Sequence, residues 1–88
     1  MTVYVDKSIY RYRRMVMCHM LADNLDELHE MAEKIGVKRR WFQQGSTPHY
    51  DICKSKRALA IEHGAQEVNR REVVTIIRRL RTEIHHNS

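Results

Sequence analysis

Two kinds of hydrophobic pattern alternate along this chain and restrict the fold it can adopt. Short apolar runs of strand character occur at residues 2–5 and 15–20. Stripes with helical spacing run from Leu25 to Ile35 and from Val73 to Ile84. Because 88 residues support one hydrophobic core, this alternation predicts a single compact α/β domain over residues 1–88. We expect a small sheet of short strands with about three helices.

The hydrophobic pattern predicts some strands outright and leaves alternatives open for other segments. Residues 2–5 form a first strand that ends at Asp6, and residues 15–20 form a second. Residues 40–43 are predicted as a third strand, which a turn at 45–48 ends. The basic, tyrosine-rich residues 8–14 fit either a loop or a poorly formed strand extension. Residues 49–52 fit either a strand or an extended entry to a helix, and residues 66–68 return to the sheet.

Capping signals place the helices. Asp23-Asn24 offers an N-cap with Glu27 as its partner, and Gly36 stops this first helix. A second helix is predicted from about 55 to 63. Asn69 caps the third, a basic amphipathic helix over about 70–84 whose arginines lie mostly outside its apolar stripe.

Composition limits the setting and the partners. The net charge is +5 and the pI is about 9.6, which favours an anionic partner such as a nucleotide or a nucleic acid, or else only a solvated basic surface. No apolar stretch reaches the ~20 residues of a membrane span, and no signal peptide is evident. Cys18 and Cys53 lack disulfide or zinc spacing, so we expect reduced thiols and a cytoplasmic location. A homodimer would suit a domain with so small a core.

Polar clusters stand at the ends of the apolar runs. His19 and Asp23 follow one run, His49 and Asp51 open another, and Asp6 closes a third. If the runs are neighbouring strands, these groups meet at one sheet edge, where α/β proteins favour ligands. We therefore interpret His19, Asp23, His49 and Asp51 as candidate catalytic residues, with Asp6 and Asp51 as candidates for a divalent cation. In the alternative reading they only cap, pack and turn the chain.

Residues around the second cluster suggest ligand contacts. Ser55 and Arg57 lie at a helix start, where an anion such as phosphate is favoured, although a solvated first turn has the same composition. Trp41 and Tyr50 could stack on a base and Gln43 could bond its edge. The alternative places Trp41 in the core.

Several ordered segments together resemble a known family. The segments are Val3-Tyr4-Val5-Asp6, Cys18-His19-Met20-Leu21-Ala22-Asp23, Asp26-Glu27-Leu28-His29, Trp41-Phe42-Gln43, His49-Tyr50-Asp51 and Arg57 with Gly64-Ala65. Over about residues 3–68 they are similar to a small domain-of-unknown-function family encoded by tailed bacteriophages and their bacterial hosts. Members often carry a further Asp after the position of Asp6, where this chain has Lys7, which weakens a metal-dependent interpretation. The resemblance implies a bacterial cytoplasm but no activity.

Two functions of different classes follow from these observations. The first is a phosphate- or nucleotide-directed site, with hydrolysis as the candidate reaction and a divalent cation as a candidate cofactor. The second is a non-catalytic phage accessory protein that binds nucleic acid, a signal nucleotide or a host protein, through its arginine-rich last helix and Arg11-to-Arg14 segment. The sequence does not decide whether the protein is an enzyme.

Overall fold

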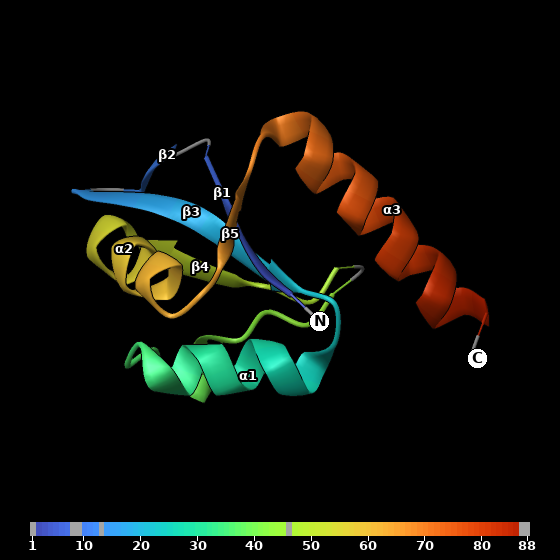
Figure 1. Cartoon of the computed structure of the whole chain (residues 1–88), viewed down its shortest axis with the longest axis horizontal. Coiled ribbons are helices and arrows are strands. Elements are labelled where there is room, and N and C mark those ends of the chain that lie inside the picture. The colour runs from blue at the N-terminus through green and yellow to red at the C-terminus, as the bar shows by residue number, and fades with distance from the viewer. Residues whose placement is uncertain (1, 8–9, 13, 46, 87–88) are drawn as a thin grey trace.

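A computed structural model describes residues 2–7, 10–12, 14–45 and 47–86, which form three layers (Figure 1). The elements in chain order are β1 (Val3–Asp6), β2 (Tyr10–Tyr12), β3 (Met15–Ala22), α1 (Leu25–Lys34), the 3-10 turn η1 (Arg39–Trp41), β4 (Tyr50–Cys53), α2 (Lys54–Glu62), β5 (Gln66–Val68) and α3 (Arg70–His86). A sheet separates α1 and α2 from α3. The predicted compact α/β domain is confirmed.

The longest strand, β3, organises the sheet. It pairs antiparallel with β1 through Val3↔Ala22 and Val5↔Met20, and β2 continues along the same side of β3. On its other side β3 pairs antiparallel with β4, while β5 lies parallel to β1 at the far edge. The sheet is therefore mixed, with β4 at one edge and β5 at the other.

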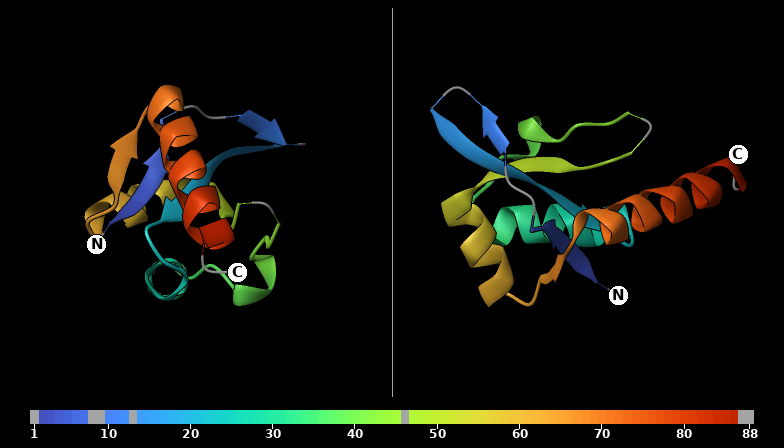
Figure 2. Two further views of the ribbon diagram at one scale, coloured as in Figure 1. Left: turned by 90° about the vertical axis from the view of Figure 1, so that its right-hand side faces the viewer. Right: turned by 90° about the horizontal axis from the view of Figure 1, so that it is seen from above.

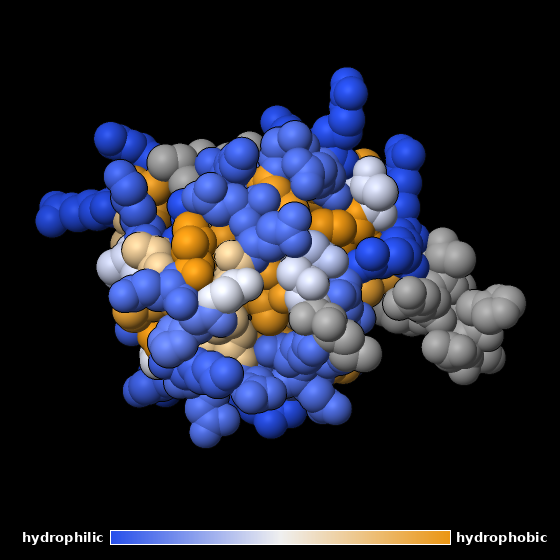
Figure 3. Space-filling model, in the orientation of Figure 1, coloured by the Kyte–Doolittle hydropathy of each residue, from blue (hydrophilic) through white to orange (hydrophobic). Residues whose placement is uncertain are grey.

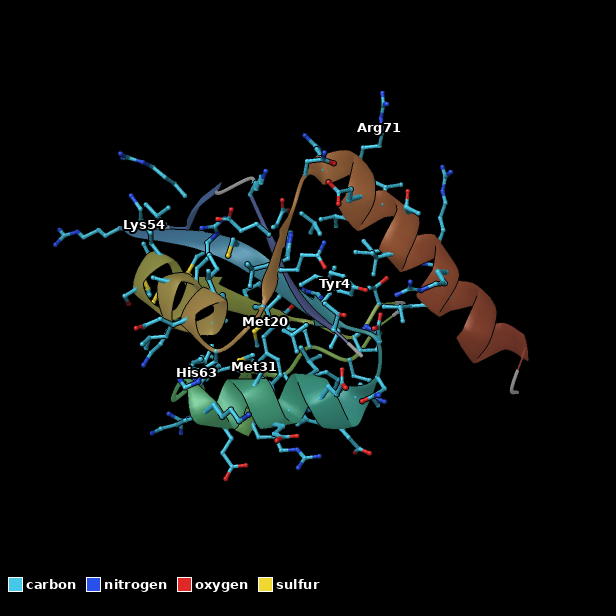
Figure 4. All side chains as sticks on the ribbon, in the orientation of Figure 1. Tyr4, Met20, Met31, Lys54, His63 and Arg71 are labelled. Carbon is cyan, nitrogen blue, oxygen red and sulfur yellow. The ribbon has the colours of Figure 1, made fainter. Side chains whose placement is uncertain are left out.

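Strand alternation divides the core between the two faces of the sheet. Met20 and Met31 lie between the sheet and α1 (Figure 4), within a cluster that also holds the buried Tyr50. Tyr4 lies on the opposite face, where Leu21 and Val68 pack against α3. Figure 2 shows α3 crossing this second face and extending past the sheet at its C-terminal end. Much of the face near β3 and β4 is thus left without a helix over it.

Local capping explains why the helices begin where they do. The Asn24 side chain accepts a hydrogen bond from Glu27 N at 2.8 Å, and the Asn69 side chain accepts one from Glu72 N at 2.9 Å. These bonds satisfy backbone donors that the first helical turn leaves unpaired. Both predicted N-caps are confirmed, and α2 begins one residue earlier than expected.

The segment predicted as a third strand, residues 40–43, folds differently. Backbone bonds from Trp41 N to Lys38 O and from Phe42 N to Arg39 O close a 3-10 turn, each at 3.0 Å. Only Gln43 pairs as a strand would, through a bridge to His49. The prediction was wrong because the basic residues before Trp41 supply no inward-facing apolar partner. Trp41 is 60% exposed and Phe42 alone packs on the core.

The open strand predictions are also decided. Residues 10–12 form a short strand, so the tyrosine-rich segment is an extension of the sheet, while residues 8, 9 and 13 lie outside the described part. Residues 50–53 are a strand that runs straight into α2.

Hydrophilic side chains cover most of the face in Figure 3, with apolar ones visible between them. Within the described ranges, no helix has the length and apolar character needed to cross a membrane.

Candidate functional site

Strand register brings three of the predicted residues together. His19 on β3 lies directly opposite Asp51 on β4. His49 stands two residues before Asp51 and shares its face, because side chains alternate along a strand. Asp6 lies one step beyond the Val5↔Met20 pair of β1 and β3, which places it across from His19. All four side chains are on the face of the sheet that carries α3.

The cluster converges on one oxygen of Asp51. His19 Nε2 lies 3.5 Å from Asp51 Oδ1, and His49 Nε2 lies 3.6 Å from the same atom. The two imidazole rings meet edge to face, with centroids 5.3 Å apart. One ligand-type atom from each of these three residues lies within 4.8 Å of the others, so the set has the composition and spacing to hold a metal ion.

Neighbouring groups fix the orientation of the cluster. His49 Nδ1 donates to the Thr47 carbonyl oxygen at 2.8 Å, which leaves His49 Nε2 as an acceptor in the neutral ring. Gln43 Nε2 donates to Asp51 Oδ2. Asp51 Oδ1 is buried and has no hydrogen-bond partner among the described residues. A buried carboxylate oxygen of this kind can accept a hydrogen bond from a ligand or bind a cation.

An apolar cavity of about 700 Å³ opens beside the cluster, along the outer edge of β4. Asp51 belongs to both the cluster and the cavity lining, and Gln43, which donates to Asp51, also lines the cavity. The remaining lining residues are mostly apolar or basic: Met15, Met17, Gly36, Val37, Lys38, Arg40, Trp41, Ile52, Cys53 and Lys56. Three cations thus stand around a hollow that touches the His–Asp cluster.

Trp41 adds an aromatic surface to this cavity. It is more than half exposed, and the Arg40 guanidinium lies 5.4 Å from its ring centre. Trp41 and Gln43, predicted as a stacking group and an edge-reading amide, thus line the same cavity.

Comparison with known proteins assigns the chain to a family. The family model described as "Protein of unknown function (DUF4031)" matches residues 3–80, which is most of the chain. The chain belongs to DUF4031. No curated protein and no solved structure matches it. The predicted membership of a small family of unknown function is confirmed.

The DUF4031 fold separates Asp23 from the other three candidate catalytic residues. Asp23 follows the far end of β3 and accepts bonds from Thr2 N at 2.8 Å and Tyr4 Oη at 2.9 Å. It also pairs with Arg79 of α3. Burial alone would raise the pKa of this carboxyl, but these donors outweigh burial and lower it. Asp23 joins β1, β3 and α3 and takes no part in the His–Asp cluster.

Arg57 and Ser55 of α2 also have protein partners. Arg57 donates through Nε to the Asp6 carbonyl oxygen at 3.0 Å and forms an ion pair with Glu67 at 2.8 Å. It thereby ties α2 to β1 and β5. The Ser55 hydroxyl lies 3.2 Å from Cys53 Sγ. Arg57 therefore positions α2. The residue before it in that helix, Lys56, lines the cavity.

A further candidate, Tyr50, lies in the core, as does Cys18. Tyr50 is completely buried, and its hydroxyl lies 2.8 Å from His29 Nδ1, so it cannot stack on an external ligand. Burial raises the pKa of the Tyr50 phenol and of the Cys18 thiol, the latter to about 11. Cys18 is therefore a protonated core thiol and not a nucleophile. His29 of α1 packs against Phe42 and Tyr50.

The sequence hypothesis missed the cations of the cavity. Lys38, Arg40 and Lys56 line the cavity, and the first two lie in the basic run that directly precedes the exposed Trp41. A basic run beside an aromatic residue was the signal available.

Proposed function

We propose that this DUF4031 chain binds a phosphate ester of nucleotide type along β4 and hydrolyses it at the His19–Asp51–His49 cluster. One observation carries the proposal: Asp51 of that cluster and Gln43, which donates to Asp51, line a cavity that is also lined by cations and Trp41. Groups able to activate water thus stand beside groups able to hold a phosphate and a base.

The cavity supports recognition of the ligand. Lysine and arginine bind phosphate oxygens by charge-assisted hydrogen bonds, and Lys38, Arg40 and Lys56 all line the hollow. A planar base stacked on Trp41 would gain about 1–3 kcal/mol. The apolar remainder of the lining suits the faces of a base or sugar better than a bare phosphate ion.

The cluster supports the reaction. Imidazole and carboxylate groups activate water by accepting its proton or by holding a metal ion that lowers its pKa. The water oxygen would then form a bond to phosphorus as the ester P–O bond breaks. The departing oxygen takes up a proton, so the products are an alcohol and a phosphate.

The setting we propose is the cytoplasm of a bacterial cell, including one infected by a phage. Two free cysteines support a reducing compartment, and the sequence resemblance supports the organisms.

The test combines binding and turnover. Trp41 is the single tryptophan, so quenching of its fluorescence should report binding as nucleoside mono-, di-, tri- and cyclic phosphates are added. Phosphate or nucleoside release should follow for those that bind. Lys56→Gln should raise KM with little change in kcat, whereas His49→Ala should lower kcat. If no nucleotide quenches Trp41 and none is hydrolysed, the proposal fails.

A second candidate function rests on α3. Its outer face carries exposed arginines, of which Arg71 projects away from the body of the molecule (Figure 4). Such a surface supports binding of nucleic acid as the function of an accessory protein. Affinity for a random oligonucleotide that falls steeply with salt, and that Arg71→Glu with Arg78→Glu abolishes, would favour this candidate over the first.

A further inference from the structure

Three side chains direct one atom each into a common space beside Asp51. The Nε2 atoms of His19 and His49 lie 3.5 and 3.6 Å from Asp51 Oδ1. These separations are too long for hydrogen bonds. They match the spacing of ligands on a shared ion, because tetrahedral ligands at ~2.0–2.2 Å from a metal stand roughly 3.4 Å apart.

For two of these side chains, the protein holds the opposite atom by a hydrogen bond. His49 Nδ1 donates to the Thr47 carbonyl at 2.8 Å, and Gln43 Nε2 donates to Asp51 Oδ2. Metal-binding histidines have such partners behind them, which fix the tautomer and aim the free nitrogen at the ion. The arrangement is thus ordered on the side away from the common space.

Asp51 Oδ1 supplies an independent observation. It is fully buried and accepts no hydrogen bond among the described residues. Leaving a buried polar atom unpaired costs about 1–3 kcal/mol, and more for a charged group. A cation between Asp51 and the two imidazoles would remove that cost.

We infer that His19, His49 and Asp51 form a binding site for one divalent transition-metal ion of the zinc class. Two imidazoles and one carboxylate suit Zn²⁺ and its neighbours, whereas Mg²⁺ prefers oxygen ligands alone. Three protein ligands leave a further position for water, whose pKa a zinc-class ion lowers to near 7. The inference deepens the proposed function by naming what would activate the water, and metal binding can be measured without any substrate.

Asp6 belongs behind this site and not within it. Its side chain is 7% exposed, and its Oδ2 lies 3.7 Å from His19 Nδ1, on the side of the ring away from Asp51. A carboxylate in that place orients a metal-binding histidine and raises its basicity. Lys7 stands where related proteins often carry a further Asp, and its side chain is exposed and outside the three proposed ligands. The absence of that Asp therefore removes no ligand from this site.

Titration with Co²⁺ tests the site directly. Tag-free, chelator-treated protein should carry His85→Ala and His86→Ala, because that adjacent pair could bind transition ions by itself. We expect one Co²⁺ per chain, with the intense visible absorption of a four- or five-coordinate ion, displaced by Zn²⁺ but not by Mg²⁺. His19→Ala, His49→Ala and Asp51→Asn should each weaken binding by at least about 100-fold. Asp6→Asn should weaken it by about 10–100-fold.

Matched controls separate the site from general surface binding. His63 is an exposed histidine at the end of α2, and Asp26 is an exposed carboxylate in α1. His63→Ala and Asp26→Asn should bind Co²⁺ as the parent does. Circular dichroism shows which variants fold, and Asp51→Asn, which keeps the shape of the side chain, provides the test if a histidine variant does not.

Three outcomes would overturn the inference: no stoichiometric binding, binding unchanged in a folded Asp51→Asn variant, or equal loss in the controls. The proposed function can fail separately. Stoichiometric binding without turnover of any phosphate ester leaves the metal site standing. Turnover that persists in chelator with no metal bound removes the metal from the reaction and retains the hydrolase, while the Co²⁺ titration still decides whether the site binds a metal.

Discussion

At the residue scale, Asp51 is the most informative position. It faces His19 across the sheet, accepts a hydrogen bond from Gln43 at the cavity edge, and has one oxygen that accepts no hydrogen bond from the described part of the chain. A purely structural network would satisfy that oxygen, because buried polar groups are nearly always hydrogen-bonded. The exception is expected where stability has been given up for binding or catalysis.

Replacing Asp51 with Asn should therefore stabilise the protein. The amide oxygen can still accept from Gln43, while the new NH₂ can donate to the acceptor nitrogen of His49. We expect a gain of about 0.5–1.5 kcal/mol in the free energy of unfolding in metal-free protein, or a rise in Tm of several degrees. Urea titration of both proteins measures it. A loss of stability greater than that of Asp26→Asn would show that Asp51 is structural.

The two cysteines should differ in reactivity. Burial would raise the pKa of Cys53 as well, but bonds from the Ser55 hydroxyl and from the backbone N–H groups of Ser55 and Lys56 outweigh it and lower that pKa. Burial raises the pKa of Cys18 to about 11. Because the thiolate is the reactive form, a disulfide reagent at pH 7.5 should modify Cys53 quickly and Cys18 only when the protein unfolds. Cys53→Ser should remove the fast phase and Ser55→Ala should slow it. A fast phase that survives Cys53→Ser would contradict this assignment.

Sequence reasoning found part of this residue-level picture. Alternation along a strand is enough to put His49 and Asp51 on one face. The meeting of His19 with Asp51 depends on the pairing of β3 with β4, whose register is set by tertiary contacts far apart in the chain. The prediction for Asp23 fails because Asp23 lies just beyond the C-terminal end of β3, whereas His19 lies within the strand, beside β4.

At the scale of elements, local signals predicted well and non-local ones did not. The starts of α1 and α3 follow from capping residues three positions apart, which are visible in the sequence. The strand predicted over residues 40–43 is wrong, because the η1 turn over residues 39–41 forms there instead. Phe42, which follows the turn, packs on a core cluster to which α1 and β4 contribute, and the local pattern does not contain that contact. Arg40 and Trp41 of the same turn line the cavity. The proposed ligand surface was therefore the part of the fold least predictable from sequence.

The docking of α3 should depend on the charge of Asp23. Its pKa is lowered in the folded state, so the stabilisation is complete above the ordinary pKa and is lost as pH falls through the folded value. Urea melts should show unfolding free energy falling from about pH 5 downward. Asp23→Asn should cost about 1–3 kcal/mol at pH 7 and should flatten that acid dependence. Asp26→Asn, an exposed change in α1, should leave the dependence intact. Equal acid profiles for the parent and Asp23→Asn would contradict the role of Asp23.

At the scale of the whole molecule, the two candidate functions use different parts of one basic protein. The net charge of +5 attracts any anion, so salt dependence alone does not choose between them. Lys38 and Lys56 line the cavity beside Asp51, whereas Arg70 and Arg71 begin α3 and are exposed. Replacing either pair with glutamine removes two positive charges. Comparing the two double variants therefore separates the effect of net charge from the effect of direct contact with the ligand.

The two double variants should differ in their affinity for a nucleotide. Lys38→Gln with Lys56→Gln should weaken Trp41 quenching by at least about tenfold, because each charge-assisted bond to phosphate contributes about 1.5–3 kcal/mol before solvent screening reduces it. Arg70→Gln with Arg71→Gln should change the Kd less than twofold at 0.15 M salt, where charges separated by more than about 8 Å are screened. For a long oligonucleotide, the α3 pair should matter more if the accessory function is correct. Equal losses from both pairs would mean that the ligand responds only to net charge, and the cavity would then have no claim to be its site.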